Sequence, residues 1–412
     1  MRVLFLNNFF YLRGGSERVL FSEIEMLRDM GHEVAVFSRE NRLNDASLYE
    51  RYFPPAMDTG TSILSLKNLA IMEEILYSRA AKSGLMSVIE DFKPDVAHMH
   101  NTYGRLSLSV LDGLKERRIP TVMTLHDYKL LCPSYLMLNH GEICERCRGG
   151  RFYYAFMTKC HKDSYGASAI YAFESWLGRR GKKYDFLRAL ITPSLFLTNK
   201  MIEYGWSAER LTHLPNPVAA GPTSSENIHG DYLLYFGRLS PEKGISTLLE
   251  ALSSLDATVP VYIVGEGPEE ARLRSLAKDR GIAASFTGYL TDKALEDAIS
   301  GAKVVVVPSE CYENAPLSIL EAFAYAKPVI GSRIGGIPEM IDDGINGFLF
   351  EPGNSEDLRS KIEAVVHLLP ESTVRQMGMA AREKVEKEYS PKLHYERLIA
   401  IYKKAILGIA DT

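Results

Sequence analysis

The sequence contains no apolar run that approaches the roughly 20 residues of a membrane-spanning helix. It also lacks a strong charge of either sign. Its 48 Lys and Arg against 52 Asp and Glu give a formal net charge of −4, so no global field favours nucleic acid. Only five of the 412 residues are cysteine, which excludes a small disulfide-rich scaffold. Hydrophobic residues make up 46% of the chain, enough to fill the cores of two or three globular domains.

The N-terminal segment MRVLFLNNFFYL is apolar but is interrupted by asparagines, and no small-residue cleavage site follows it. We therefore interpret it as a first strand rather than a signal peptide. Together with the low cysteine content, this predicts a cytoplasmic protein.

Short β-branched or apolar runs alternate with longer helical patterns along nearly the whole chain. This alternation predicts the α/β class, with parallel sheets covered by helices. Amphipathic helices are expected over 16–31 and 69–92. The expected strands of the first half are 2–7, 32–38, 94–100, 120–126 and 189–194. The continuous apolar character of VAVF and TVMTL is typical of strands buried on both faces.

Three Pro, two Gly and several small polar residues gather in 215–230, a composition typical of an exposed connection. We expect a first domain over 1–215, a linker over 216–230 and a second domain over 231–390. The second domain repeats the same rhythm, with strands expected over 232–237, 260–265, 284–288, 302–309 and 327–332.

The last stretch, 391–412, has a helical pattern with no strand after it, and we expect it to pack back on the first domain. Both domains are predicted to be doubly wound and Rossmann-like. Their strand ends would then face a shared cleft, where open parallel sheets bind ligands.

Two cations follow the first strand of the second domain. Arg238 and Lys243, in FGRLSPEKG, flank a turn before a helix. Surface Arg and Lys side chains near turns are mostly just solvated. A place at the carboxyl end of a parallel strand, however, suits a ligand site, and cations there suit a departing pyrophosphate.

Two carboxylates, Glu313 and Glu321, lie eight positions apart further along the chain. Pro316 suits the first turn of the helix that follows, which places Glu313 in a loop and Glu321 inside the helix. Backbone N–H groups at that helix start are free to hold a phosphate, and Glu321 could accept from ribose hydroxyls. Glu321 could instead be an ordinary exposed residue, but its neighbours are apolar. A ligand with phosphates and hydroxyls, such as a nucleotide sugar, fits this pattern.

Two features of the first half are weaker signals. Gly14 and Gly15 open the first long helix and could let a phosphate approach its N-terminus, although such a turn often needs glycine for backbone reasons alone. His126 ends the strand predicted over 120–126, where a lone histidine is more often structural than catalytic.

Together these motifs resemble the family 4 retaining glycosyltransferases, which have the GT-B fold of two Rossmann-like domains facing a cleft. The resemblance covers nearly the whole chain. The segment with the two glutamates and the upstream Arg and Lys is specific, and the glycine motifs support it. The motifs that carry the resemblance are RGGSE at 13–17, TLHD at 124–127, GRLSPEKG at 237–244, GEGP at 265–268, FTGY at 286–289, the 313–321 segment and GGIPEMI at 335–341.

The resemblance implies a role for each of these residues. Arg238 and Lys243 would neutralise the donor pyrophosphate, and Glu321 would hold the ribose. His126 and Glu313 would contact the transferred sugar as the candidate catalytic residues. Members of this fold typically work without a bound metal, so no cofactor is expected for catalysis. The remaining donor-binding positions are Gly15, Asn314, Ala315, Pro316 and Leu317.

The expected activity is therefore retaining transfer of a hexose or related sugar from a nucleotide donor, UDP rather than GDP, to an acceptor hydroxyl. The expected setting is polysaccharide or glycolipid biosynthesis, with a glycan or lipid-linked acceptor. The departing phosphate is expected to take the acceptor proton. Alternatives are a nucleotide-sugar epimerase or a phosphorylase of similar build, or a non-catalytic nucleotide-sugar sensor. A dinucleotide dehydrogenase is disfavoured because no G-x-G-x-x-G follows the first strand.

Four of the five cysteines fall within the excursion 132–160. Cys144 and Cys147 have the C-x-x-C spacing of a metal knuckle, and Cys132 and Cys160 would complete a four-sulfur set. We expect this loop to bind structural zinc. Two disulfides or free buried thiols are the alternatives, and a reducing compartment disfavours disulfides.

The region from 144 to 190 carries ten Lys and Arg against four acids, with aromatic residues between them. A solvated basic face over an aromatic core is the simpler interpretation. The alternative is peripheral contact with anionic lipid on the inner face of the membrane, or with a lipid-pyrophosphate acceptor.

Overall fold

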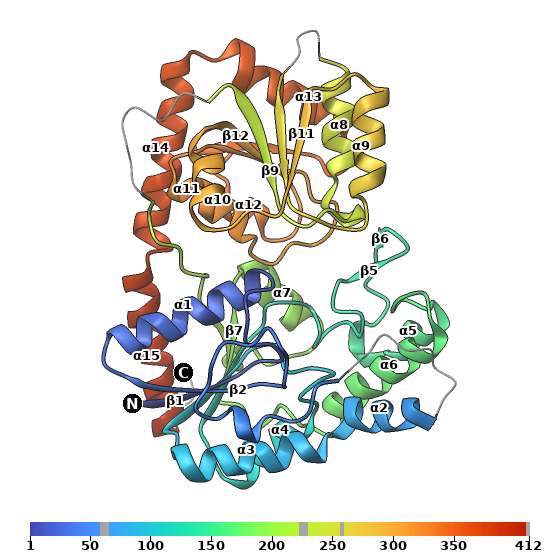
Figure 1. Cartoon of the computed structure of the whole chain (residues 1–412), viewed down its shortest axis with the longest axis vertical. Helices are drawn as coiled ribbons and strands as arrows, with labels where there is room; N and C mark the ends of the chain where they lie inside the picture. The colour runs from blue at the N-terminus through green and yellow to red at the C-terminus, as the bar shows by residue number, and fades with distance from the viewer. Residues whose placement is uncertain (58–65, 222–229, 256–258, 409–412) are drawn as a thin grey trace. The chain divides into compact units, whose positions relative to one another are not determined.

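The computed structural model describes residues 1–57, 66–221, 230–255 and 259–408. The chain divides into two compact units, the first made of Met1–Leu214 and His394–Thr412 and the second of Pro215–Leu393 (Figure 1). Part of the predicted linker, 222–229, and the end of the predicted last helix, 409–412, lie outside the described residues.

Six parallel strands form the sheet of the first unit, in the order β2-β1-β3-β4-β7-β8. Leu6, near the end of β1, lies level with Phe37 on one side and Met99 on the other, so neighbouring strands end at the same edge. The strands are β1 Arg2–Leu6, β2 Glu33–Phe37, β3 Val96–Met99, β4 Thr121–Thr124, β7 Ala189–Thr192 and β8 Leu211–His213. A separate hairpin pairs β5 Leu138–Asn139 with β6 Glu142–Ile143.

Helices of the first unit surround this sheet, and Figure 1 shows α1 and α3 on opposite sides of it. The α-helices are α1 Gly15–Asp29, α2 Leu66–Tyr77, α3 Arg79–Phe92, α4 Ser109–Glu116, α5 Tyr153–Met157, α6 Tyr165–Arg180, α7 Leu195–Glu203 and α15 Pro391–Leu407. Three short 3-10 turns are η1 Glu50–Tyr52, η2 Arg148–Gly150 and η3 Ala208–Arg210.

The single helix predicted over 69–92 is in fact two helices, α2 and α3, separated at Ser78. Ser78 has an extended backbone, and its Oγ accepts a hydrogen bond from the N–H of Ala81, which caps α3. The backbone N–H of Ser78 donates in turn to Oγ of Ser107 at 2.8 Å. The apolar pattern continues through the break, so periodicity alone could not reveal it.

The last helix, α15, shares a hydrophobic core with α1 on one face of the first sheet. Leu398 and Tyr402 of α15 pack in the same cluster as Leu20 and Ile24 of α1 and Phe5 of β1. Residues of α15 from His394 onward therefore belong to the first unit, although the helix begins in the second.

The second unit contains another six-stranded parallel sheet, in the order β11-β10-β9-β12-β13-β14. Its strands are β9 Tyr232–Phe236, β10 Val261–Val264, β11 Ala284–Gly288, β12 Ala302–Val307, β13 Val329–Ser332 and β14 Gly347–Phe350. Its helices are η4 Pro241–Lys243, α8 Ile245–Ser253, α9 Glu270–Asp279, α10 Asp292–Ser300, α11 Leu317–Ala324, α12 Ile337–Met340, α13 Ser355–Glu363, η5 Ala364–Leu368 and α14 Glu371–Glu388.

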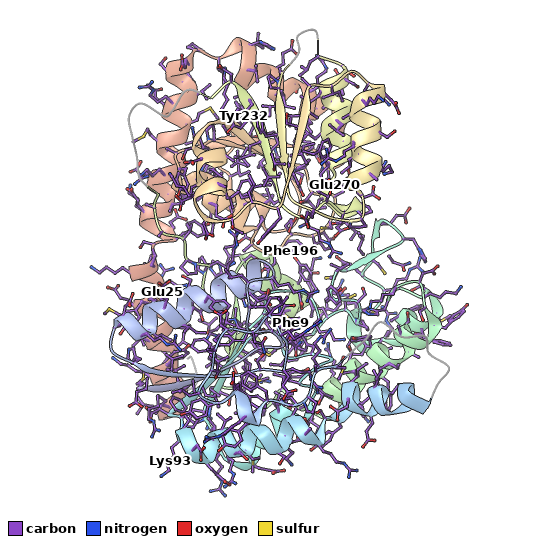
Figure 2. The ribbon with its side chains drawn as sticks, in the orientation of Figure 1. Phe9, Glu25, Lys93, Phe196, Tyr232 and Glu270 are labelled. Carbon is purple, nitrogen blue, oxygen red and sulfur yellow. The ribbon has the colours of Figure 1, made fainter. Side chains whose placement is uncertain are left out.

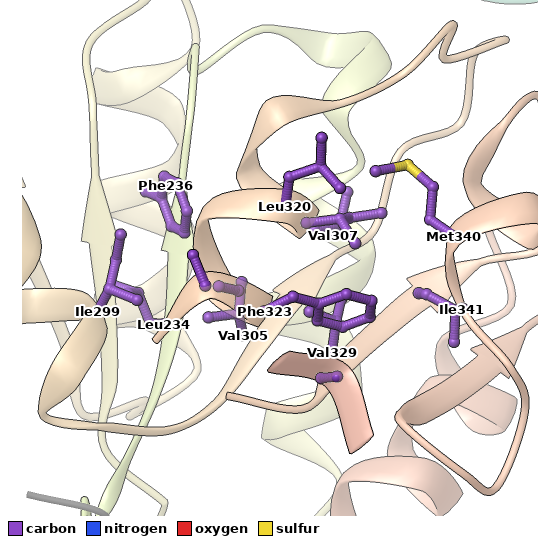
Figure 3. Packing of buried hydrophobic residues seen from close by; sticks show 14 of the residues in the cluster. Leu234, Phe236, Ile299, Val305, Val307, Leu320, Phe323, Val329, Met340 and Ile341 are labelled. Carbon is purple, nitrogen blue, oxygen red and sulfur yellow. The ribbon is translucent and has the colours of Figure 1, made fainter. Parts of the chain in front are cut away.

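Successive residues of the central strands enter opposite cores, as the two-residue repeat of a strand requires. Leu234 and Val305 pack with Phe323 of α11 on one face (Figure 3). Leu233 and Val304 pack with α8, α9 and α13 on the other face. The second sheet is thus covered on both faces, and the loops that follow its strands lie at its own carboxyl edge. Within the described part of the chain, no helix combines the length and the apolar character needed to cross a bilayer.

Candidate functional site

The second unit brings Lys243 and Glu313 into direct contact at the carboxyl edge of its sheet. Lys243 ends the turn η4 after β9, and Glu313 lies in the loop between β12 and α11. The Nζ atom of Lys243 donates to Oε1 of Glu313 at 2.6 Å, and Oγ of Ser309 donates to the same oxygen at 2.5 Å. The side chains are 28% and 12% exposed, so solvent reaches the pair only in part.

Both residues of this pair are stabilised in their charged forms. Burial disfavours the charge of each, but the facing Lys243 holds the pKa of the Glu313 carboxyl below its usual value. The Glu313 carboxylate likewise raises the pKa of Lys243 above its usual value despite burial. The pair is therefore ionic at neutral pH, and Ser309 supports the carboxylate.

Glycines let the loops around this pair approach closely. Gly335 has φ of +60°, and a Cβ there would lie 2.3 Å from the carbonyl oxygen of Glu313. That carbonyl accepts a hydrogen bond from the N–H of Gly336 at 2.8 Å. Gly244, with φ of +66°, leaves space for the carbonyl of Pro308 in the same way. The motifs around Gly244 and Gly335 therefore fix the positions of Lys243 and Glu313.

Arg238 lies beyond the end of β9 and is exposed. The hydroxyl of Tyr235 donates to its backbone carbonyl at 2.7 Å, which fixes the main chain there. Across the described residues the guanidinium group forms no ion pair. Arg238 and Lys243 thus both follow the carboxyl end of one strand, as predicted, and Lys243 is paired with Glu313.

The helix α11 begins at Leu317, with Pro316 as the residue just before it rather than in its first turn. Asn314 is 8% exposed, and the carbonyl of Ala315 accepts from the side chain of Asn216 at 3.4 Å. Glu321 is partly buried on the same helix. The predicted loop position of Glu313 and helical position of Glu321 both match the structure.

The first unit holds the other predicted residues at its own carboxyl edge. Gly15 is the exposed first residue of α1. His126 lies two residues after β4, is partly exposed, and its Nε2 lies 2.7 Å from Nδ1 of His100. The surrounding protein and His100 lower the pKa of His126 to about 3, whereas burial raises the pKa of Asp127 to about 6.

The cysteine-rich excursion has little regular structure, and all five cysteines of the chain are free thiols. Cys144 follows the β5–β6 hairpin, and Cys147 precedes the turn η2. Burial, together with Cys132, Cys160 and Cys144, raises the pKa of Cys147, so the four thiols lie close enough to influence one another.

The tightest cluster of potential metal ligands lies elsewhere in the first unit. Among the described residues, Glu23, His98 and His100 form the group whose ligand atoms all lie within 4.8 Å of one another. The cysteines do not form such a group in the described chain, so their zinc binding stays a prediction.

Sequence reasoning missed several residues that shape these sites. Ser309 holds Glu313, and its only signal was its place as the last residue of the strand predicted over 302–309. His100 contacts His126, and Glu23 lies on the other side of the His100 ring. The H-x-H spacing of His98 and His100 could have predicted that the two rings lie together, because alternate residues of a strand share one face.

Comparisons with known proteins identify the family and the fold of the chain. A family model described as Glycosyltransferase Family 4 matches residues 13–220, and one described as Glycosyl transferases group 1 matches residues 224–384. The sulfoquinovosyl transferase SQD2 of Arabidopsis thaliana is 26% identical over 382 residues, which cover 88% of this chain and 66% of that protein. Glycogen synthase of Mycobacterium tuberculosis is 29% identical over 230 residues, which cover 53% of each protein. The chain thus spans less than two thirds of the length of these relatives.

Solved structures share the whole fold. Anabaena HepE, solved with UDP and glucose, superimposes with a TM-score of 0.70 at 20% identity over 98% of this chain and 100% of that one. Sucrose-phosphate synthase of Thermosynechococcus elongatus gives 0.72 at 16% identity over 99% of each chain. Two doubly wound units, the site residues at their strand ends and a family model over more than half the sequence lead to one conclusion. The chain is a glycosyltransferase of family 4 with the GT-B fold.

Proposed function

We propose that this glycosyltransferase moves a sugar from a UDP-sugar donor to an acceptor hydroxyl with retention of anomeric configuration. The observation that carries the proposal is the ion pair of Lys243 and Glu313 at the carboxyl edge of the second sheet. HepE, a protein of the same fold, was solved with UDP, with UDP and glucose, and with UDP-glucose, which favours UDP over GDP as the donor nucleotide.

In this proposal the donor pyrophosphate lies against Arg238 and Lys243. A pyrophosphate gains negative charge as the sugar departs, and cations placed there stabilise that charge without a bound metal. Glu321 accepts from the ribose hydroxyls, while Glu313 and His126 contact the transferred sugar. The remaining donor contacts are backbone groups of Gly15, Asn314, Ala315, Pro316 and Leu317.

The chemical step then needs no protein nucleophile. The bond from the anomeric carbon to the phosphate oxygen breaks, a bond to the acceptor oxygen forms on the same face, and a phosphate oxygen takes the acceptor proton. With a pKa of about 3, His126 is neutral at physiological pH. It therefore acts as a hydrogen-bond partner of the sugar rather than as an acid.

We also propose that the acceptor is a glycan or lipid-linked molecule, reached at the inner face of a membrane, in polysaccharide or glycolipid assembly. The first unit exposes an unusual set of large side chains beside basic ones. Phe173 stacks on Trp176 with ring centroids 5.8 Å apart, and Nζ of Lys159 lies 4.6 Å from the ring of Tyr165. The exposed large side chains of α5 and α6 are Tyr153, Phe156, Met157, Tyr165, Phe173 and Trp176.

Exposed aromatic side chains with basic side chains among them favour contact with anionic lipid over a merely solvated face. Flotation with neutral and with anionic liposomes tests this. Binding to anionic vesicles that the double substitution Phe173→Ser and Trp176→Ser removes would support the proposal. Absence from both kinds of vesicle would overturn it.

We further propose that Cys132, Cys144, Cys147 and Cys160 hold a structural zinc ion. The mutual effect of the thiols on the pKa of Cys147 supports their convergence. The hydroxyl of Ser134 lies 3.2 Å from Sγ of Cys132. A hydrogen bond with Ser134 also lowers the pKa of Cys160, although burial raises that pKa overall. The buried cluster beside them consists of Cys147, Phe152, Ala155 and Ala172, a small core for which a metal would supply missing stability.

The donor proposal is tested by thermal unfolding with UDP, GDP, ADP and their sugar conjugates. We expect stabilisation by the UDP series, and an equal increment with and without EDTA because the cations replace a metal. The anomeric configuration of the product, read by NMR, tests retention. An inverted product would overturn retention. Donor binding without any transfer would instead favour a nucleotide-sugar sensor, and a sugar released without acceptor would favour an epimerase.

A further inference from the structure

A buried carboxylate lies among three histidines in the first unit. Glu23 of α1 is 1% exposed, His98 of β3 and His100 just after it are fully buried, and His394 of α15 is 5% exposed. Oε1 of Glu23 lies 3.1 Å from Nε2 of His394. Its Oε2 lies 3.3 Å from Nδ1 of His98 and 3.4 Å from Nε2 of His100. Two separate segments, β3 with the residue after it and α15, therefore direct three imidazole nitrogens at one carboxylate of α1.

This carboxylate is charged even though burial disfavours the charge. The facing His98, His100 and His394 hold the pKa of the Glu23 carboxyl well below its usual range. Burial keeps the pKa of His98 well below its usual value, so that ring is neutral. A buried anion of this kind needs N–H donors around it.

The contacts assign the ring protons of His100. Within the described structure, Nε2 of His100 is buried and faces Oε2 of Glu23, an oxygen that also lies near Nδ1 of His98. A bare nitrogen lone pair facing a carboxylate oxygen would be repulsive, so Nε2 of His100 carries the proton. Nδ1 of His100 is then an acceptor.

The tautomer of His100 determines the tautomer of His126, because the two rings are in contact. Nε2 of His126 lies 2.7 Å from Nδ1 of His100, and the two rings stack with centroids 5.0 Å apart. Because Nδ1 of His100 is an acceptor, Nε2 of His126 must be the donor. A neutral imidazole has only one N–H, so Nδ1 of His126 keeps its lone pair. Nothing in the described chain donates to that nitrogen.

We propose that Glu23 and His100 are positioning residues that lock His126 in the Nε2–H tautomer, so that its Nδ1 accepts a hydrogen bond from a hydroxyl of the transferred sugar. The inference rests on the proposed function, in which His126 contacts that sugar. The tautomer itself follows from the buried chain of contacts and can be measured in the absence of any substrate. Failure of the tautomer assignment is therefore distinguishable from failure of the proposed function.

The first test is ¹⁵N NMR of the full-length protein with labelled histidine. The chain has ten histidines, so His126→Ala identifies the signal of interest. We expect His126 at neutral pH to show a protonated Nε2 and an unprotonated Nδ1. A protonated Nδ1, or a positively charged ring, would overturn the proposal. This measurement needs no folded variant at position 23.

Glu23→Gln tests the cause of that tautomer. Oε1 of the new amide would keep the donor His394, so its NH₂ group would face His100. Nε2 of His100 would then become an acceptor, and both rings would exchange tautomers. We expect a protonated Nδ1 on His126 and a loss in kcat of about tenfold, the worth of one hydrogen bond. Glu25→Gln is the matched control, because Glu25 is exposed on the same helix (Figure 2).

A structural defect caused by Glu23→Gln would also lower kcat. A double variant distinguishes such a defect from the loss of the His126 tautomer. In the His126→Ala background, Glu23→Gln should cause no further loss in kcat, since the tautomer no longer matters. Additive losses would overturn the positioning role. The same three side chains lie close enough to hold a metal. If the wild-type protein contained one divalent ion per chain and the Glu23→Gln variant contained none, the proposed tautomer lock would also be overturned.

Discussion

The ammonium group of Lys243 lies 2.6 Å from the carboxylate of Glu313, a residue 70 positions further along the chain. The two loops that carry these side chains are joined a second time, because the N–H of Glu310 donates to the carbonyl of Glu242 at 2.9 Å. A donor phosphate at Lys243 would share its cation with Glu313. Binding of the donor phosphate at Lys243 should therefore affect Glu313, the carboxylate proposed to contact the sugar.

Lys243→Ala and Glu321→Ala should each weaken donor binding or turnover by at least about tenfold, equivalent to roughly 1.4 kcal/mol. The first change removes a cation from the pyrophosphate, and the second removes an acceptor for the ribose. Steady-state kinetics and titration with UDP provide the measurements. Lys278→Ala, at an exposed position of α9, is the control. Unchanged kinetics in both site variants would refute the assignment.

Gly335→Ala should lower activity far more than Gly344→Ala. Both glycines have positive φ, +60° and +79°, so both substitutions strain the backbone by about 1–3 kcal/mol. A Cβ at Gly344 meets nothing within 4 Å, whereas one at Gly335 must displace the main chain of Glu313. The two variants should therefore have comparable stability loss from strain but different kcat. Equal activities would show that the position of Glu313 does not matter.

Protein purified without chelator should contain about one zinc ion per chain, as a four-sulfur site predicts. Replacing Cys144 and Cys147 together by serine should abolish the zinc and lower the melting temperature. Cys311→Ser is the control, because Cys311 is buried in the second unit. A metal content near zero in well-folded protein, or two disulfides by thiol titration, would contradict the site.

The sheets could largely be predicted from the sequence, because strands buried on both faces have continuous apolar runs. The predicted strand VVVV became β12, whose alternate residues enter two cores. β8 and β14 escaped notice. β8 contains only 3 residues and is only partly buried, so it has no extended apolar run. β14, Gly347–Phe350, has the apolar run FLF but follows several turn-forming residues.

His126, Arg238 and Glu313 lie in the loops that follow strands, where the apolar pattern and the fold class together predict a ligand site. Their mutual contacts were not predictable, because they depend on how separate loops fold back. Nothing local connects Lys243 with Glu313, or Glu23 with His394, which are 371 positions apart. Such long-range pairs follow from the packing of the whole unit, not from any short motif.

Lys129→Met should destabilise the first unit by about 3–5 kcal/mol, the usual effect of removing one partner from a buried ion pair. Nζ of Lys129 lies 2.9 Å from Glu174, and the side chains are only 5% and 2% exposed. The change would leave the Glu174 carboxylate buried without its cation. Urea unfolding measures the loss. Lys82→Met breaks a more exposed pair with Glu116 and should cost less than about 1 kcal/mol. Equal losses would contradict the argument.

The free energy of unfolding of the Asp127→Asn variant, relative to that of the wild type, should increase as the pH rises from 4 to 7. Burial raises the pKa of Asp127 from 3.8 to about 6, so between these values the native state binds more protons than the unfolded state. The stability that Asp127 contributes is thus complete below pH 3.8 and lost as the pH rises through 6. Asparagine has no proton to lose, so the variant should gain on the order of 2–3 kcal/mol over the wild type.

Free energies of unfolding in urea, measured for both proteins at several pH values, test this sign. The amide keeps an oxygen that can accept from the N–H of Lys129, as Oδ1 of Asp127 does at 2.9 Å, so the local turn should persist. In the folded protein His126 has a pKa of about 3 and does not titrate in this range. It is present in both proteins, so the difference between them reports on residue 127. A difference between the two proteins that shrinks as the pH rises would mean that Asp127 is stabilised as an anion, most directly by Lys129.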